Sequence, residues 1–129
     1  MENFEKETIA AIATALSDSG IGIVRISGEN AIYIVDSIFR STSGKKILTK
    51  VQSHTIHYGY IVDKDENIID EVMTSVMKAP KSYTMEDTVE INCHGGVLVM
   101  QKVLETVLQA GARPVSYTHL RAHETRGNL

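Results

Sequence analysis

This sequence lacks the features that mark secreted or membrane proteins. It contains one cysteine, so no internal disulfide can form, and a reducing, cytoplasmic setting is expected. Residues 1–16 carry acidic side chains where a signal peptide would be basic. No stretch approaches the roughly 18 consecutive apolar residues of a membrane helix. We therefore expect a soluble, cytoplasmic protein that does not enter the membrane.

The chain also lacks an excess of basic charge and a recognisable nucleotide-binding motif. A net charge of −3 argues against broad electrostatic binding of nucleic acid, although a local basic groove stays compatible with it. The stretch "GIGIVRISG" (20–28) fails as a dinucleotide fingerprint, because Arg25 stands where the third glycine is needed. The stretch "SGKK" (43–46) lacks the upstream glycine and the following Ser or Thr of a P-loop. No GTP or ATP site is therefore recognisable in these residues.

What is present indicates one packed domain. Hydrophobic residues make up 43% of the 129 residues and charged residues 22%, a balance typical of a globular core. The pattern favours an α+β fold, with helices packed on one face of a mixed β-sheet. Strands are predicted at 20–27, 54–62, 67–79, 88–94 and 112–115, and helices at 29–39 and 97–111. Residues 8–14 are predicted to form either a strand or a short helix. Ser27 or the Gly28 region is expected to cap the first helix.

Strand alternation singles out two charged residues as candidates for a binding site. Arg25 shares a strand face with Ile21 and Ile23, and Glu90 shares one with Asn92 and His94. A guanidinium among such apolar neighbours should not be buried alone. Its partner is predicted to be either a carboxylate of the same chain or an anionic ligand.

The same alternation argues against a reaction centre at "VEINCHGG" (89–96). Cys93 and His94 should point to opposite sides of the sheet, whereas a thiolate–imidazole pair or a shared metal needs them to converge. Cys93 is expected to be a small buried residue and His94 a structural one. His119 and His123 have the spacing of a helical metal pair, but no third ligand is evident, so no metal site is predicted.

Two long stretches carry a resemblance to a known family. "TIAAIAT" and "GIGIVRISG", followed by "MKAPKSYTMEDTVEINCHGG", resemble the N-terminal domain of the MnmE/TrmE family of tRNA-modification GTPases. The resemblance runs from about Thr8 to about Arg113 and covers most of the chain. It implies a domain similar to the folate-binding domains of aminomethyltransferases, at residues 1–114.

The resemblance implies a function and a set of partners. With the flavoprotein MnmG, in a heterotetramer, members of the family add a carboxymethylaminomethyl or aminomethyl group to the wobble uridine of certain tRNAs. The N-terminal domain forms a homodimer and binds 5-formyl- or 5,10-methylene-tetrahydrofolate. The family's folate-contacting arginine and glutamate fall on Arg25 and Glu90. GTP, Mg²⁺ and K⁺ would bind a G domain outside these residues, and no catalytic residue is expected here.

Two alternatives and one anomaly stay open. The chain could instead begin a separate aminomethyltransferase-like folate enzyme, or be purely a dimerisation module in which Arg25 and Glu90 pair with each other. The sequence departs from the family pattern over residues 115–129, which read "VSYTHLRAHETRGNL". We interpret the sequence as a gene fragment whose last segment is not native.

Overall fold

A computed structural model describes residues 7–13, 22–79 and 86–116 of the chain. These residues form a mixed β-sheet and two helices, and the predicted α+β class is confirmed. In chain order the elements are β1 (Ile9–Ile12), β2 (Gly22–Ser27), α1 (Ala31–Ile38), β3 (Phe39–Ser41), β4 (Thr55–Val62), β5 (Ile68–Met77), β6 (Thr88–Cys93), α2 (Val97–Gln109) and β7 (Arg113–Pro114).

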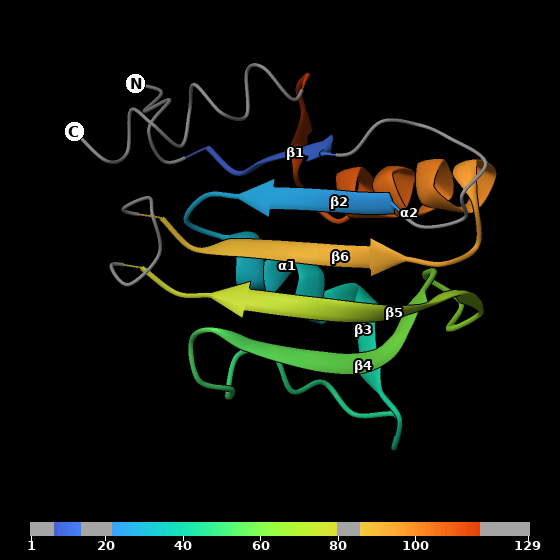
Figure 1. Cartoon of the computed structure of the whole chain (residues 1–129), viewed down its shortest axis with the longest axis horizontal. Helices are drawn as coiled ribbons and strands as arrows, with labels where there is room; N and C mark the ends of the chain where they lie inside the picture. The colour runs from blue at the N-terminus through green and yellow to red at the C-terminus, as the bar shows by residue number, and fades with distance from the viewer. Residues whose placement is uncertain (1–6, 14–21, 80–85, 117–129) are drawn as a thin grey trace.

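The strands lie in the order β3-β4-β5-β6-β2-β1-β7 (Figure 1). Every neighbouring pair is antiparallel except β1 and β7, which are parallel. The strand predicted at 20–27 is β2, and it lies inside the sheet between β1 and β6. This order brings β2 and β6 together, although residues 28–87 lie between them in the sequence.

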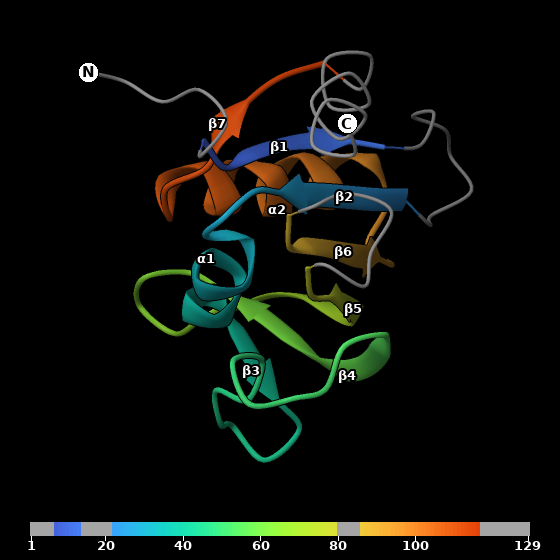
Figure 2. The same cartoon turned by 90° about the vertical axis from the view of Figure 1, so that its left-hand side faces the viewer.

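Both helices lie on the same side of the sheet (Figure 2). Alternate residues of the central strands, including Val24, Val72 and Ile91, are fully buried on that side. They pack with Val35 of α1 and with Val103 of α2 in one hydrophobic core. The opposite side of the sheet carries no described helix, and we call it the open face.

The entry to and exit from α1 differ from the sequence prediction. The helix ends at Ile38 rather than Phe39, and Phe39 begins β3, a strand that the sequence analysis did not predict. Phe39 has extended dihedrals and a fully buried ring, because pairing with β4 outweighs one more turn of helix. The prediction that Ser27 or the Gly28 region caps α1 is wrong, because the N-cap residue is Asn30. Instead the backbone N–H of Asn30, at the N-cap, donates to Thr8 Oγ1 at 2.9 Å.

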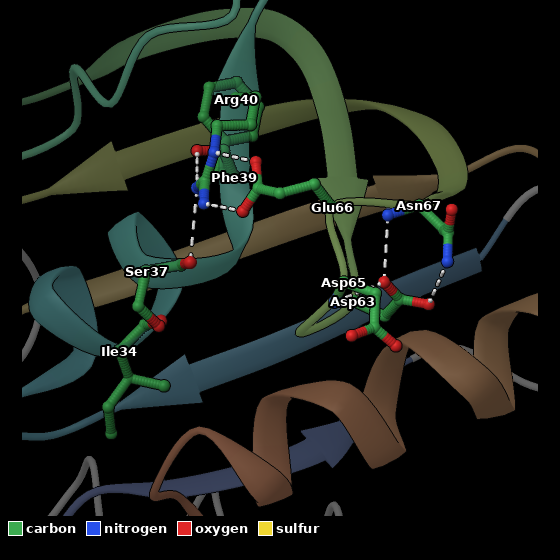
Figure 3. A network of polar contacts seen from close by, with 8 residues as sticks. All are labelled: Ile34, Ser37, Phe39, Arg40, Asp63, Asp65, Glu66 and Asn67. Carbon is green, nitrogen blue, oxygen red and sulfur yellow. Dashed lines mark hydrogen bonds and ion pairs between the residues drawn. The ribbon is translucent and has the colours of Figure 1, made fainter.

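The strands predicted at 54–62 and 67–79 are confirmed as β4 and β5, which form an antiparallel pair, and two carboxylates organise the loop between them (Figure 3). Asp63 Oδ1 accepts the backbone N–H groups of Asp65 and Asn67, both at 2.9 Å. Glu66 accepts from Arg40 through both oxygens, at 3.1 Å from Nε and 2.7 Å from Nη2. The loop is therefore tied to its own backbone and, through Arg40, to the edge strand β3.

These contacts lower the pKa of both carboxyl groups in the loop. The backbone N–H of Asn67 is the main cause for Asp63, and the hydrogen bond from Arg40 is the main cause for Glu66. Because each folded-state pKa lies below its ordinary value, this stabilisation is present above the ordinary pKa. It is lost as the pH falls through the folded-state value.

Candidate functional site

Arg25 and Glu90 face each other across the two central strands. They are paired residues in the antiparallel register of β2 and β6, so their side chains share one face of the sheet. Arg25 Nε lies 3.4 Å from Glu90 Oε2. The side chains are 16% and 26% exposed, so the pair is partly desolvated yet still reachable by a ligand. The structure thus brings together the two residues that alternation had marked, and places them on the open face.

The sequence predicted two possible partners for the Arg25 guanidinium, a carboxylate of the same chain or an anionic ligand. A carboxylate of the same chain is present, as the dimerisation-module alternative predicted. Both side chains keep some exposure on the open face, so a ligand that offers each charge a new partner can replace the contact without leaving either charge unpaired. The two groups can therefore exchange partners at small cost if a ligand offers a better match. The role of Arg25 and Glu90 as ligand contacts stays a prediction.

The surroundings of the pair are mixed in character. Among the described residues of the open face, the large apolar side chains that are exposed are Ile56 at 61%, Tyr58 at 48% and Met73 at 39%. Tyr58 pairs across the strands with Met73, and Met73 pairs in turn with Asn92 of β6. An apolar stripe on β4 and β5 therefore runs directly beside the polar residues of β6.

Asn92 is a polar residue of this face to which the sequence analysis gave no role. It lies two residues after Glu90 on β6, and the two side chains point the same way. Its Oδ1 atom is buried, and no described residue donates a hydrogen bond to it. Alternation could place Asn92 on this face, but only the packed structure reveals that its carbonyl is buried.

Cys93 and His94 are separated, as predicted. Cys93 is 1% exposed and its thiol lies 3.7 Å from the carbonyl of Ile91. His94 is exposed and its Nδ1 lies 3.1 Å from the carbonyl of Glu71. Desolvation, with a smaller effect from the Asp70 carboxylate, raises the pKa of the Cys93 thiol to about 12. Such a thiol is a core group and not an activated nucleophile.

Alkylation of Cys93 should report on unfolding. At about pH 8 we expect iodoacetamide to modify the folded chain at least about 100-fold more slowly than the chain in concentrated urea, because the thiolate is the reactive form. The raised pKa also favours the folded state below the ordinary value of 9.0. That stabilisation is lost as the pH rises towards 12. Equal rates with and without urea, followed by mass spectrometry, would contradict a buried thiol.

Asp70 holds the turn that follows β6, a role that the sequence analysis missed. The residue is 9% exposed, and its Oδ2 accepts the backbone N–H of His94 at 2.8 Å and of Gly95 at 3.3 Å. Gly96 then adopts φ 91°, a conformation that favours glycine, and α2 begins at the next residue. Within the described part of the chain, no side chain caps α2. Asp70 on the neighbouring strand therefore fixes the passage from β6 into the helix.

Several further predictions can be placed only in part. His119 and His123 lie outside the described residues, as does most of the 115–129 segment. The absence of a metal site at the two histidines and the non-native origin of the segment therefore stay predictions. In the described ranges, no three His, Cys, Asp or Glu side chains gather in a way that could hold a metal ion. Neither described helix is long and apolar enough to cross a membrane.

The fold and the open face define a single-sheet α+β domain with an accessible charged pair at its centre. A family model described as "GTP-binding protein TrmE N-terminus" matches residues 8–117. The chain therefore belongs to the family of TrmE N-terminal domains, and the resemblance stated from its motifs is confirmed.

Three curated relatives that the chain matches are each named tRNA modification GTPase MnmE. The protein of Lachnoclostridium phytofermentans is 63% identical over 107 residues, which cover 83% of this chain and 23% of the relative. That of Thermoanaerobacter pseudethanolicus is 56% identical, with the same two shares. That of Geobacillus kaustophilus is also 56% identical, over 84% of this chain and 24% of the relative. The chain thus spans about a quarter of the length of these relatives.

Proposed function

We propose that this chain is the N-terminal part of a tRNA-modification GTPase and that it binds a tetrahydrofolate one-carbon donor on the open face. The whole protein works in the cytoplasm with the flavoprotein MnmG, in a heterotetramer, and modifies the wobble uridine of certain tRNAs. GTP, Mg²⁺ and K⁺ belong to a G domain that follows. Membership of the TrmE N-terminal family supports this proposal.

The observation that carries the folate site is the Arg25–Glu90 pair on the open face. A carboxylate can accept two parallel N–H groups from the edge of a pterin ring, as Glu90 would. The Arg25 guanidinium can bind a carbonyl or carboxylate of the same ligand. Both 5-formyl- and 5,10-methylene-tetrahydrofolate offer these groups, and bound folate supplies the one-carbon unit.

The proposal includes a homodimer, and the apolar stripe beside the site supports it. Ile56, Tyr58 and Met73 together expose apolar surface on the sheet face that the described helices leave uncovered. Covering such a stripe with a second copy removes it from water.

Replacing Glu90 tests the folate site. A Glu90→Gln chain should bind 5-formyltetrahydrofolate at least about tenfold more weakly than the parent in titration calorimetry, since a charged acceptor is lost. Its unfolding free energy should fall by about 1 kcal/mol, because glutamine has nearly the same shape and keeps an oxygen that can face Arg25. Glu105→Gln, an exposed position on α2, makes the same charge change away from the site and should bind like the parent. Equal affinities of all three chains would refute the site.

One observation favours a second candidate function, the pure dimerisation module. Arg25 and Glu90 are already paired within the chain, which satisfies both charges without a ligand. A parent chain that forms dimers in sedimentation experiments but releases no heat with folate would favour this alternative. A sequence following this chain that carries a second folate-type domain and no P-loop would favour the separate aminomethyltransferase-like enzyme.

A further inference from the structure

The Asn92 amide is a polar group whose position the fold of the free chain leaves unexplained. Its Oδ1 is buried, with no hydrogen-bond donor among the described residues. Its neighbours in the sheet register are Ile23 on β2 and Met73 on β5, whose side chains carry no donor. The residue as a whole is only partly buried, so other atoms of the side chain reach the open face, and Oδ1 would meet a ligand there after the amide turns about its Cβ–Cγ bond.

An orphaned carbonyl at this place is unfavourable for folding. A buried acceptor without a donor has lost its hydrogen bonds to water and gained none in return. Asparagine is also depleted in strands, whereas a β-branched residue would suit this position between Ile23 and Met73. The position therefore carries a residue that lowers the stability of the free domain, a pattern common at binding sites.

The location of Asn92 indicates what could satisfy it. Asn92 and Glu90 project from the same face of β6 and stand about 7 Å apart, the distance between alternate strand residues. Both offer acceptor oxygens, and Arg25 across from Glu90 offers donors. Ile23 and Met73 on either side of Asn92 offer apolar contact. This arrangement suits a flat heterocycle, whose edge N–H groups can donate to the two acceptors while its ring contacts the apolar side chains.

We propose that Asn92 is a further ligand-contacting residue of this site, and that its amide oxygen accepts an N–H of the same heterocycle that Glu90 binds. The proposal rests on the proposed folate site and deepens it, because it names a second residue that recognises the ring. Glu90 accepts hydrogen bonds from one set of ring N–H groups, and Asn92 accepts from another. The tail of the ligand does not contact Asn92.

Asn92→Leu in the 129-residue chain separates binding from stability. The variant should bind 5-formyltetrahydrofolate about tenfold more weakly in calorimetry, yet melt at the same temperature as the parent or higher, because an orphaned carbonyl is removed. A tetrahydropterin without the aminobenzoylglutamate tail is the second probe and should lose affinity by the same factor. Gln101→Leu, an exposed amide on α2, is the matched control and should bind like the parent.

The outcomes distinguish this inference from the function on which it rests. If Asn92→Leu binds like the parent while Glu90→Gln is weakened, the folate site stands and the role of Asn92 is overturned. If Asn92→Leu melts clearly below the parent, Asn92 makes a structural hydrogen bond and the inference fails. If neither the parent nor any variant binds the two probes, the folate site fails and the inference falls with it.

Discussion

A Gly59→Ala substitution should lower the free energy of unfolding by about 3 kcal/mol, the largest effect expected here. A Cβ at this position of β4 would overlap the carbonyl oxygen of Arg40 and lie 2.6 Å from Cζ of the Phe39 ring. The Phe39 ring is fully buried and cannot move aside without opening the core. Urea unfolding followed by circular dichroism measures the change.

Gly44→Ala is the matched control for Gly59→Ala. Gly44 has φ 82° and open space where its Cβ would be, so alanine there meets backbone strain without a clash. That strain costs about 1 kcal/mol. Gly59 has no left-handed backbone, so its substitution reports the clash alone. If the two variants were equally stable, β3 would not lie as close to β4 as the structure has it.

Asp70→Ala should lower the free energy of unfolding by about 2 kcal/mol. The substitution removes the acceptor for two backbone N–H groups, of His94 and Gly95, at the point where β6 turns towards α2. Hydrogen bonds to a charged acceptor contribute more than neutral ones, and these two are partly shielded from water. The exchange of the His94 and Gly95 amide protons, measured by NMR, should accelerate more than that of the other amides.

Two variants serve as controls for Asp70→Ala. Asp70→Asn keeps an acceptor oxygen and should recover about half of the loss. Asp65→Ala removes an equal charge from an exposed loop position and should change stability by less than about 0.5 kcal/mol. Unchanged amide exchange at His94 in Asp70→Ala would contradict the role of Asp70 as the group that fixes this turn.

Local pattern was sufficient to predict most elements of the fold. Alternating β-branched residues between glycines marked β2, and apolar residues at helical spacing marked α2. It failed at β3, because three residues are too short for a period and Phe39 continues the apolar spacing of α1. There the contact with β4, distant in sequence, determined the conformation.

The candidate site divides in the same way. Alternation placed Arg25 on one strand face and Glu90 on another, since side-chain direction in a strand follows from covalent geometry alone. It could not show that these two strand faces lie on the same side of one sheet. That required β2 and β6 to be neighbours in register, which is a property of the sheet. Asp70 escaped notice for the same reason, because its partners are about 25 residues away and on another strand.

The sequence by itself therefore determined the class of fold, the family, the burial of Cys93 and the separation of Cys93 from His94. These follow from composition, periodicity and long motifs, which need no knowledge of contacts between distant segments. Tertiary structure alone decided the pairing of Arg25 with Glu90 and the burial of the Asn92 carbonyl. Both depend on which strands become neighbours, and strand order is set by the packing of the whole core.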